Sequence, residues 1–536
     1  MKRLIALCLA AALLLCGCGG QQTESSQTTE SEPASEPTES TAVDSGSFGL
    51  SYLPEYGLNP YTCTATVNRA IFSLMYESLF VVSNQFRAEP LLCESFTASE
   101  DGRTYVYRLL SGVTFSDGTP LTARDAAASL NAARDSELYA GRLEHITTIS
   151  VLDDSVFSIV LDTPYENFSL MLDVPVVKAD TVGAAAPVGT GPFTLNGDRL
   201  RRNTAWWQEG EPAVKAAVKA AEIPLTAAAT PNALRDNFEF GTTDLIYCDP
   251  NSPAAVGYRC DFEVWEVPTT ILHYLGFNVR GGLFASDTLR TAVTCMIDRD
   301  TLSNACYGGF AIPATLPCSP DSDLSDAQLA AQYAYDLPRF QAAVNNSGVQ
   351  SSEEAPGVFL VCSDDPTRVA VAEKLNETFR ACGLFLTVRA LPLKQYKSAL
   401  SNGNFDLYLG EVRLTANFDL SEFFSSEGNL NYGGISDTEL ARLCIASLEN
   451  SGNYADLCAR ILGTAPICPV AFKSYAIYVT RGKLASITPA VDYLFHNAVT
   501  ARTLADADRT YEQSNAGETG GEPSEPTDGS AESTEP

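Results

Sequence analysis

The sequence predicts an α/β fold, and two observations support that prediction. Strand-like and helical segments alternate, most clearly where the apolar run 358–362 is followed by a helical segment, 367–382, and by a second strand-like run, 386–391. Apolar residues also recur at the three- and four-residue spacing of a helix with one buried face, as in residues 289–297. A sheet covered by helices explains both patterns.

The elements nearer the N-terminus follow from the same periodicities. Residues 66–79 have the apolar spacing of a helix, whereas residues 104–109 alternate as a half-buried strand does. Thr122, with Asp125 three residues later, predicts a capping box at the start of the next helix. Residues 156–161 are apolar and β-branched, and we expect a further strand there.

Composition and motifs exclude several classes of function. The chain has 536 residues, of which 35 are basic and 66 acidic, and the net charge of −31 argues against binding nucleic acid through its phosphates. The three histidines, His145, His273 and His496, lie far apart. No HExxH zinc motif, phosphate-binding loop, dinucleotide fingerprint or GxSxG nucleophile motif occurs. We therefore expect no catalytic residues, no metal site and no cofactor.

The first eighteen residues resemble a bacterial lipoprotein signal peptide. Lys2 and Arg3 precede an unbroken apolar run at residues 4–15, which as a helix of about 18 Å is too short to span a bilayer core of about 30 Å. Residues 15–18 read Leu-Cys-Gly-Cys, a pattern similar to a lipobox with Cys18 as the lipidated residue. We expect an extracytoplasmic protein anchored to the cell membrane through Cys18, and an ordinary secretory signal is the alternative.

Both ends of the remaining chain have the composition of disordered segments. Residues 19–47 and 510–536 are acidic, rich in Ser, Thr, Gly and Pro, and nearly free of large apolar side chains. Such segments cannot bury enough apolar surface to offset the entropy of ordering the chain. We expect the first to be a spacer between the anchor and the folded body.

The cysteines of the body suggest no metal or redox motif. Of the 15 cysteines, Cys8 and Cys16 would leave with the signal peptide and Cys18 would be lipidated, so 15 − 3 = 12 remain. Their spacing is irregular and no CxxC pair occurs. Apolar surroundings favour buried free thiols, whereas secretion favours disulfides, and the sequence leaves both open.

Short motifs then follow in order between about residues 50 and 480. They are MYESL at 75–79, YVYRLLSGVTFSDGTPLTARD at 105–125, GTGPF at 189–193, NTAWWQEGEP at 203–212, GFN at 276–278, LRTA at 289–292 and IDR at 297–299. Each alone is weak evidence, but the ordered series resembles the extracellular solute-binding proteins of family 5, the oligopeptide, dipeptide and nickel receptors of ABC importers.

The resemblance implies a type II periplasmic-binding-protein fold. In this fold two α/β lobes are joined by hinge strands, an extra domain is inserted in the first lobe, and closure traps ligand between the lobes. The implied boundaries are 1–18 for the signal peptide, 19–47 and 510–536 for the disordered ends, 48–61, 187–273 and 477–509 for lobe one, 62–186 for the inserted domain, and 274–476 for lobe two.

The segment 411–424 departs from the family pattern. Peptide receptors of the family often have here a tryptophan and an aspartate that face the cleft, and the aspartate pairs with the peptide ammonium. This chain has Arg413 and Ala416 in those places. Because a guanidinium pairs well with a carboxylate or phosphate, we expect an anionic ligand group near Arg413. The alternative is that Arg413 pairs with an acid such as Glu411 and only supports the lobe.

The resemblance also implies the function. We expect a lipid-anchored, monomeric substrate-binding subunit of an ABC importer that binds peptides or a related small polar solute and delivers them to permease subunits. Tyr274, Asn278 and Asn417 are further candidates for ligand contacts. A surface sensor or adhesin that kept the fold without transport is one alternative. A secreted hydrolase is less favoured, because no motif marks a pair of catalytic carboxylates.

Overall fold

A computed structural model describes residues 48–209, 220–255, 257–425, 428–487, 489–491, 494–495 and 502–503. The predicted signal peptide with Cys18, the acidic linker and the acidic tail lie outside the described residues, so the predictions made for them stay predictions. In the described part of the chain, no helix is long and apolar enough to cross a membrane.

Eleven strands form one mixed sheet. They are β1 (Leu50–Tyr52), β10 (Phe193–Asn196), β11 (Arg199–Arg202), β12 (Glu222–Ala227), β13 (Leu245–Cys248), β14 (Phe262–Phe277), β15 (Ala311–Pro313), β16 (Gly357–Cys362), β17 (Leu386–Leu391), β18 (Leu407–Arg413) and β19 (Ile467–Thr480). The order is β10-β11-β12-β1-β13-β19-β14-β18-β16-β17, with β15 paired to β19. The half from β10 to β13 falls in the segments predicted for lobe one and keeps that name, and the half from β18 to β17 falls in the segment 274–476 predicted for lobe two and keeps that name.

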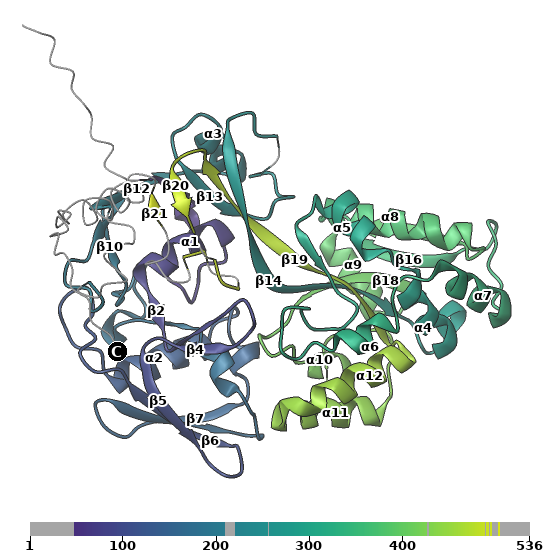
Figure 1. The fold of residues 1–536 in the computed structure, drawn as a ribbon, viewed down its shortest axis with the longest axis horizontal. Helices are drawn as coiled ribbons and strands as arrows, with labels where there is room; N and C mark the ends of the chain where they lie inside the picture. The colour runs from purple at the N-terminus through teal and green to yellow at the C-terminus, as the bar shows by residue number, and fades with distance from the viewer. Residues whose placement is uncertain are drawn as a thin grey trace, which may run out of the picture. The chain divides into compact units, whose positions relative to one another are not determined.

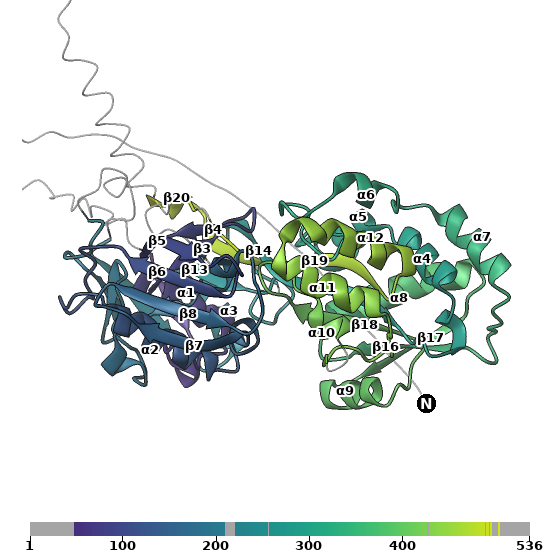
Figure 2. The ribbon, with the colours of Figure 1, turned by 90° about the horizontal axis from the view of Figure 1, so that it is seen from below.

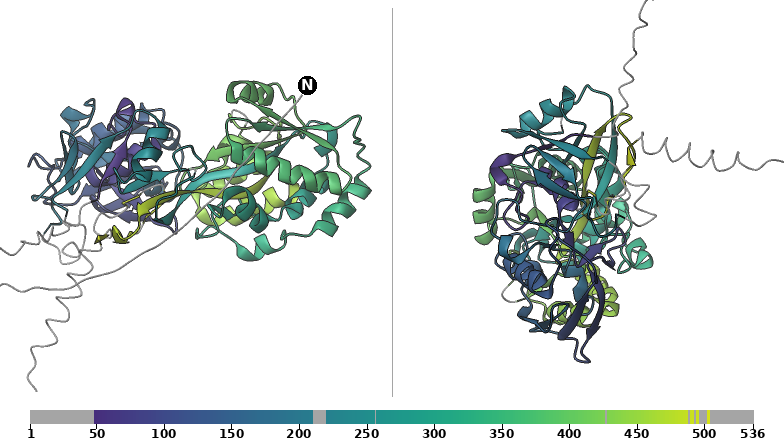
Figure 3. Two further views of the ribbon diagram at one scale, coloured as in Figure 1. Left: turned by 90° about the horizontal axis from the view of Figure 1, so that it is seen from above. Right: turned by 90° about the vertical axis from the view of Figure 1, so that its left-hand side faces the viewer.

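The two long strands β14 and β19 belong to both halves of this sheet. They lie side by side and antiparallel (Figure 1), as the teal and yellow-green strands of the left view in Figure 3 also show. The C-terminal part of β19 pairs with β13, whereas residues 271–277 of β14 pair with β18. The predicted lobe boundaries at 273/274 and 476/477 therefore fall inside continuous strands.

The pairing of β14 with β19 is interrupted between Pro268 and Ile271. Side-chain hydroxyls bond to the neighbouring strands there: Thr269 donates to the carbonyl of Lys473 at 2.5 Å, and Thr270 donates to the carbonyl of Leu414 at 2.7 Å. Directly after this interruption, at Ile271, the other edge of β14 begins to pair with β18. It is the place where the sheet passes from one lobe to the other.

The inserted domain contains a separate four-stranded antiparallel sheet. Its elements are β2 (Glu77–Ser78), β3 (Phe80–Val82), β4 (Ala88–Pro90), β5 (Cys93–Ala98), β6 (Thr104–Leu109), α2 (Ala123–Arg134), β7 (Ile146–Val151), β8 (Val156–Leu161) and β9 (Pro175–Val176), and the sheet order is β5-β6-β8-β7. The predicted strands 104–109 and 156–161 are confirmed as β6 and β8. The capping box of Thr122 and Asp125 is confirmed at the start of α2.

The remaining helices are α1 (Thr66–Met75), α3 (Pro231–Glu239), α4 (Asp287–Met296), α5 (Arg299–Tyr307), α6 (Ala327–Ala331), α7 (Leu337–Ser347), α8 (Pro366–Ala381), α9 (Leu393–Ser401), α10 (Ser421–Phe424), α11 (Thr438–Glu449) and α12 (Tyr454–Thr464). α1 falls within the segment 62–186 predicted for the inserted domain, but it packs against β1, β10 and β13 of the main sheet. The helices from α4 to α12 fall within the segment predicted for lobe two. A short pair, β20 (Leu484–Ser486) and β21 (Arg502–Thr503), lies near the end of the described chain.

Both faces of β16 are covered, which is typical of a strand inside an α/β layer with parallel strands. Phe359 and Val361 of β16 belong to the apolar cluster that contains α8, whereas Leu360 belongs to the cluster that contains α9. Figure 2 shows these two helices on opposite sides of β16. The segments predicted as strand, helix and strand between 358 and 391 are confirmed as β16, α8 and β17.

The helix predicted over residues 66–79 is shorter than expected. It ends at Met75, and Tyr76 is extended with φ −126° and ψ 142°. Glu77 and Ser78 then form β2, which pairs with β9, so the prediction was wrong over the last four residues. Apolar spacing continued past the helix end because residues 76–79 are buried as a strand instead.

Three of the motifs meet at the buried side chain of Glu77. Its carboxylate accepts hydrogen bonds from the Thr190 hydroxyl at 2.7 Å and from the indole nitrogens of Trp206 at 3.0 Å and Trp207 at 2.8 Å. No cation forms an ion pair with Glu77 in the described part of the chain, and burial raises its pKa to about 7. These motifs therefore join the inserted domain to lobe one and are scaffold.

Candidate functional site

The cleft-side edge of lobe two is formed by the carboxyl ends of parallel strands. β16 and β18 are parallel, and ligands of open α/β sheets bind outside such strand ends. Asp365 follows β16 and caps the N-terminus of α8, while Glu411 and Arg413 end β18. Alternation along β18 puts the side chains of Glu411 and Arg413 on one face of the sheet.

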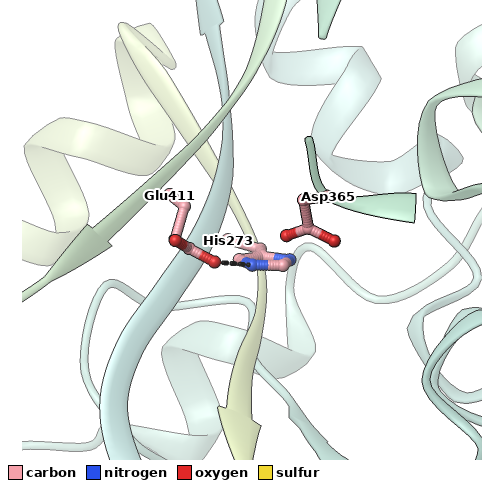
Figure 4. Close-up of side chains that lie close together, drawn as sticks. All are labelled: His273, Asp365 and Glu411. Carbon is pink, nitrogen blue, oxygen red and sulfur yellow. Dashed lines mark hydrogen bonds and ion pairs between the residues drawn. The ribbon is translucent and has the colours of Figure 1, made fainter. Parts of the chain in front are cut away.

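His273 of β14 lies directly opposite Glu411 of β18 and is fully buried. Its Nε2 is 2.8 Å from the Glu411 carboxylate (Figure 4). Its Nδ1 is 2.8 Å from the Tyr307 hydroxyl. Burial raises the pKa of Glu411, but the hydrogen bond with His273 and the charges of Arg368 and Lys473 outweigh it and lower that pKa to about 2. Glu411 therefore stays ionised in a partly buried place.

His273, Asp365 and Glu411 each offer one atom to a metal ion, and these atoms lie within 4.8 Å of one another. Arg368 donates from Nε to Asp365 at 3.0 Å, and the Lys473 charge also acts on Glu411. Two cations thus already offset the two carboxylates, and His273 has hydrogen-bond contacts at both ring nitrogens. The arrangement fits an ion-pair network better than a metal site.

This network also reaches lobe one. The Lys473 ammonium is 2.5 Å from the carboxylate of Asp249, which follows β13 directly. Lys473 lies on β19 opposite Ile271, and Ile271 lies opposite Arg413 on its other side, so Arg413 and Lys473 occupy the same row across the sheet. The face that holds His273 and Glu411 is therefore lined by alternating charges up to the crossing between the lobes.

A cavity of about 560 Å³ lies between the inserted domain and lobe two. Apolar side chains form much of its wall, among them Phe80, Phe96, Tyr105, Leu170, Leu324 and Tyr454. Its polar wall includes Arg87, Glu166, Asp323, Asn417 and Asp419. Small-molecule sites in proteins have this size and this mixture of apolar walls and few polar groups.

The charges on the cavity wall are unbalanced. Arg87 makes a bidentate pair with Asp323, at 2.5 and 2.8 Å, and this contact lowers the pKa of Asp323. Glu166 accepts from the backbone N–H of Ser451 at 2.6 Å. Within the described residues no cation forms an ion pair with Glu166 or with Asp419, so two carboxylates of the wall are not neutralised by the chain.

Of the four predicted ligand contacts, Asn417 reaches this cavity. Its side-chain amide donates to the Tyr165 hydroxyl of the inserted domain at 2.9 Å, and its carbonyl accepts from the Thr415 hydroxyl at 2.7 Å. Arg413 is exposed at the end of β18 and does not line the cavity. The alternative, in which Arg413 pairs with an acid such as Glu411 and supports the lobe, stays a prediction as well; Glu411 is also bonded to His273.

The other two candidates lie within lobe two. Tyr274 is 2% exposed, and its ring packs against Tyr408 and Phe423 at centroid distances of 5.7 and 5.0 Å. The amide of Asn278 donates to the carbonyls of Gly403 at 3.4 Å and Phe405 at 3.1 Å. The structure does not bring the four candidates together, and their contact with a ligand stays a prediction.

Sequence reasoning missed the cavity-wall residues Arg87, Glu166 and Asp323. Arg87 and Asp323 are 236 residues apart, and no local pattern marks either of them as belonging to a site. Glu166 lies 285 residues from Ser451, to which it is bonded. Such pairs are visible only once the inserted domain and lobe two are placed side by side.

A family model for bacterial extracellular solute-binding proteins, family 5 (middle region), matches residues 87–429. Among curated proteins, the glutathione-binding protein GsiB of Escherichia coli K12 is 25% identical over 310 residues, covering 54% of this chain and 59% of GsiB. The chain thus matches about three fifths of the length of these curated relatives.

Solved structures support the same fold at low sequence identity. The ABC transporter substrate-binding protein CtaP from Listeria monocytogenes has a TM-score of 0.70 at 18% identity, over 85% of this chain and 99% of CtaP. The putative peptide-binding protein AppA from Clostridium difficile has a TM-score of 0.68 at 17% identity, over 85% and 100%. The fold is therefore the two-lobe type II periplasmic-binding-protein fold, and the chain belongs to the bacterial extracellular solute-binding proteins of family 5.

Proposed function

We propose that this chain is the substrate-binding subunit of an ABC importer and binds a peptide or another small polar solute between the inserted domain and lobe two. The observation that supports this most is the 560 Å³ cavity bordered by Asn417 and by the carboxylates of Glu166 and Asp419. Family membership supports a binding role, and the names of the relatives describe binding proteins.

Binding would proceed by hinge closure without a chemical step. β14 and β19 pass from one lobe to the other, and the interrupted pairing at residues 269–270 gives the sheet a place to bend. Closing lobe two onto the inserted domain removes the ligand from water, and the closed form would dock on the permease. We propose a monomer, since one chain contains both walls of the cavity.

The ligand would have two charged groups, one inside the cavity and one outside it near Arg413. Arg413 at the end of β18 is suited to a carboxylate or phosphate, and the two carboxylates on the cavity wall are suited to a cationic group. A peptide is a ligand class that has both charges. Glu166 and Asp419 would then pair with the peptide ammonium in place of the aspartate that this chain lacks at Ala416.

The ligand can be identified by mass spectrometry of the molecules released when the purified full chain is denatured. We expect one class of small polar solute, with peptides first among them. Adding that solute back to refolded chain should raise the melting temperature as its concentration exceeds Kd, through mass action. A chain that releases no solute, and whose melting temperature no peptide pool raises, would refute the proposal.

We further propose that Cys18 is lipidated and anchors the chain to the outer face of the cell membrane. The motivation is the Leu-Cys-Gly-Cys box after the apolar run of residues 4–15. Cys18→Ala should move the protein from the membrane fraction to the soluble fraction, whereas Cys16→Ser should leave it in place. Retention of the Cys18→Ala chain in the membrane would contradict the lipid anchor.

A further inference from the structure

The turn between β3 and β4 of the inserted domain contacts lobe two through an aromatic pair. Phe86 in this turn lies 4.8 Å from Phe418, between ring centroids, and Phe418 lies 5.5 Å from Phe472 of β19. Phe86 is 6% exposed and Phe418 is fully buried. A row of three rings therefore connects the inserted domain to a strand that crosses between the lobes.

Both residues of this contact have a positive backbone φ angle. Phe86 has φ +59° and Phe418 has φ +57°, a left-handed conformation that bulky side chains rarely adopt. The turn is held by hydrogen bonds from the amides of Phe86 and Arg87 to Ser83. Strained residues of this kind persist where the surrounding structure determines them, and they cluster at ligand clamps and switch regions.

Further contacts between the inserted domain and lobe two surround the cavity. Next to Phe86, Arg87 pairs with Asp323. The Glu166 amide donates to the carbonyl of Leu448 at 2.7 Å, and its carboxylate accepts from the Ser451 amide. The amides of Glu166 and Ser451 are therefore protected from hydrogen exchange by these bonds only while the inserted domain and lobe two stay together.

We infer that the β3–β4 turn is a latch, in which Phe86 seated on Phe418 holds lobe two closed over the cavity. The inference rests on the proposed function only in taking the cavity as the ligand site. The latch would raise the fraction of ligand-free molecules that are closed, and this fraction sets the apparent affinity for ligand. The inserted domain would therefore have a role in binding. The contact between the two rings should contribute most of the energy of the latch. Both members of the Arg87–Asp323 pair are more than half exposed, and exposed ion pairs contribute little.

The decisive variant is Phe86→Gly. Glycine removes the ring and adopts φ +59° without strain, so we expect the turn and the fold to be retained. In the full chain freed of ligand by unfolding and refolding, hydrogen exchange of the Glu166 and Ser451 amides should be about tenfold faster. These amides belong to a second contact between the inserted domain and lobe two, in which Phe86 takes no part, so faster exchange there reports opening between the inserted domain and lobe two. Peptides from β16 should keep the parent exchange rate, which shows that lobe two is folded.

Phe240→Ala is the matched control, because Phe240 is 79% exposed and does not line the cavity. It should leave exchange at Glu166 and Ser451 unchanged. Parent-like exchange of these two amides in Phe86→Gly, with β16 protected, would overturn the latch.

The ion pair provides a second test. Arg87→Ala, Asp323→Ala and the double variant should all speed exchange of the Ser451 amide by about the same factor, at most threefold, because each breaks the same contact. The pair Arg442–Glu439, which lies within α11 at similar exposure, is the control and should have no effect. Additive effects of the two single substitutions would contradict a shared contact across the junction.

These outcomes separate the latch from the proposed function. If Phe86→Gly opens the chain while the parent protein releases no solute on denaturation, the latch stands and the proposed importer function fails. If the parent releases a solute but Phe86→Gly exchanges as the parent does, the latch fails and the proposed function stands.

Discussion

The cleft-side edge of lobe two and the cavity beside the inserted domain use charge in opposite ways. At the edge, Glu411 is hydrogen-bonded to His273, and Arg368 donates to Asp365. The charges of Arg368 and Lys473 act on Glu411, so the chain neutralises its own carboxylates. In the cavity wall, two carboxylates have no cation of the described chain beside them. The difference indicates that the edge supports the structure and has its charges compensated by the chain. The carboxylates of the cavity, in contrast, can be neutralised by a cationic group of a ligand.

The largest expected effect is on the edge network. His273→Ala empties the space of a fully buried side chain and removes the hydrogen-bond partner of both Glu411 and Tyr307, and these losses together cost about 3–5 kcal/mol. Denaturant unfolding would measure the loss. Arg442→Ala, which breaks an exposed pair, is the control and should leave the free energy of unfolding nearly unchanged. A small effect of His273→Ala would show that the edge is not a support.

The pH dependence of this network has a defined sign. The pKa of Glu411 is lower in the folded chain, about 2 against an ordinary 4.5, so the folded state binds fewer protons there. Its stabilising contribution is present above about pH 4.5 and is lost as pH falls toward 2. His273→Ala removes the main cause that lowers this pKa, so the free energy of unfolding should depend less on pH between about 2 and 4.5.

Glu77 sharpens the comparison, because it is a buried carboxylate with hydrogen-bond donors but without a cation. Its pKa of about 7 lies above the ordinary 4.5, so the contribution of Glu77 to stability is fully present below about pH 4.5 and is lost as pH rises through about 7. The shift corresponds to about 3 kcal/mol at most. Unfolding of Glu77→Gln between pH 4 and 8 should lose this slope, and an unchanged slope would assign it to another group.

Arg413 tests whether the edge also serves the ligand. If it contacts an anionic group of the ligand, Arg413→Ala should weaken binding by about 2 kcal/mol in calorimetry with the solute identified by mass spectrometry. Arg413→Lys should restore part of the affinity, because the charge returns without the bidentate geometry. Equal affinities of all three chains would leave Arg413 as part of the support.

The smallest expected effect is at Asn417. Its amide donates to the Tyr165 hydroxyl of the inserted domain, and Asn417→Ala should lower ligand affinity by about 1 kcal/mol, the usual net value of one hydrogen bond. Tyr165→Phe removes the same bond from the other side and should give a similar loss. If Asn417→Ala weakens binding and Tyr165→Phe does not, Asn417 contacts the ligand directly.

The sequence by itself determined the α/β class, most of the elements and the family. Periodicity is set by neighbours a few residues apart, so β6, β8, β16, α8 and β17 were predicted with bounds within one residue. The ordered motifs indicated the family, and the match over residues 87–429 confirms it. The end of α1 was missed because buried helix and buried strand have similar apolar content.

Only the tertiary structure decided which residues meet. His273 and Glu411 are 138 residues apart, Arg87 and Asp323 are 236 apart, and no local pattern connects either pair. Tyr274 was predicted as a candidate ligand contact, and the register of β14 and β18 decides that its ring packs against Phe423 within lobe two. The physical reason is that strand register and the packing of the inserted domain on lobe two depend on the whole chain path, while local periodicity records only which face of an element is buried.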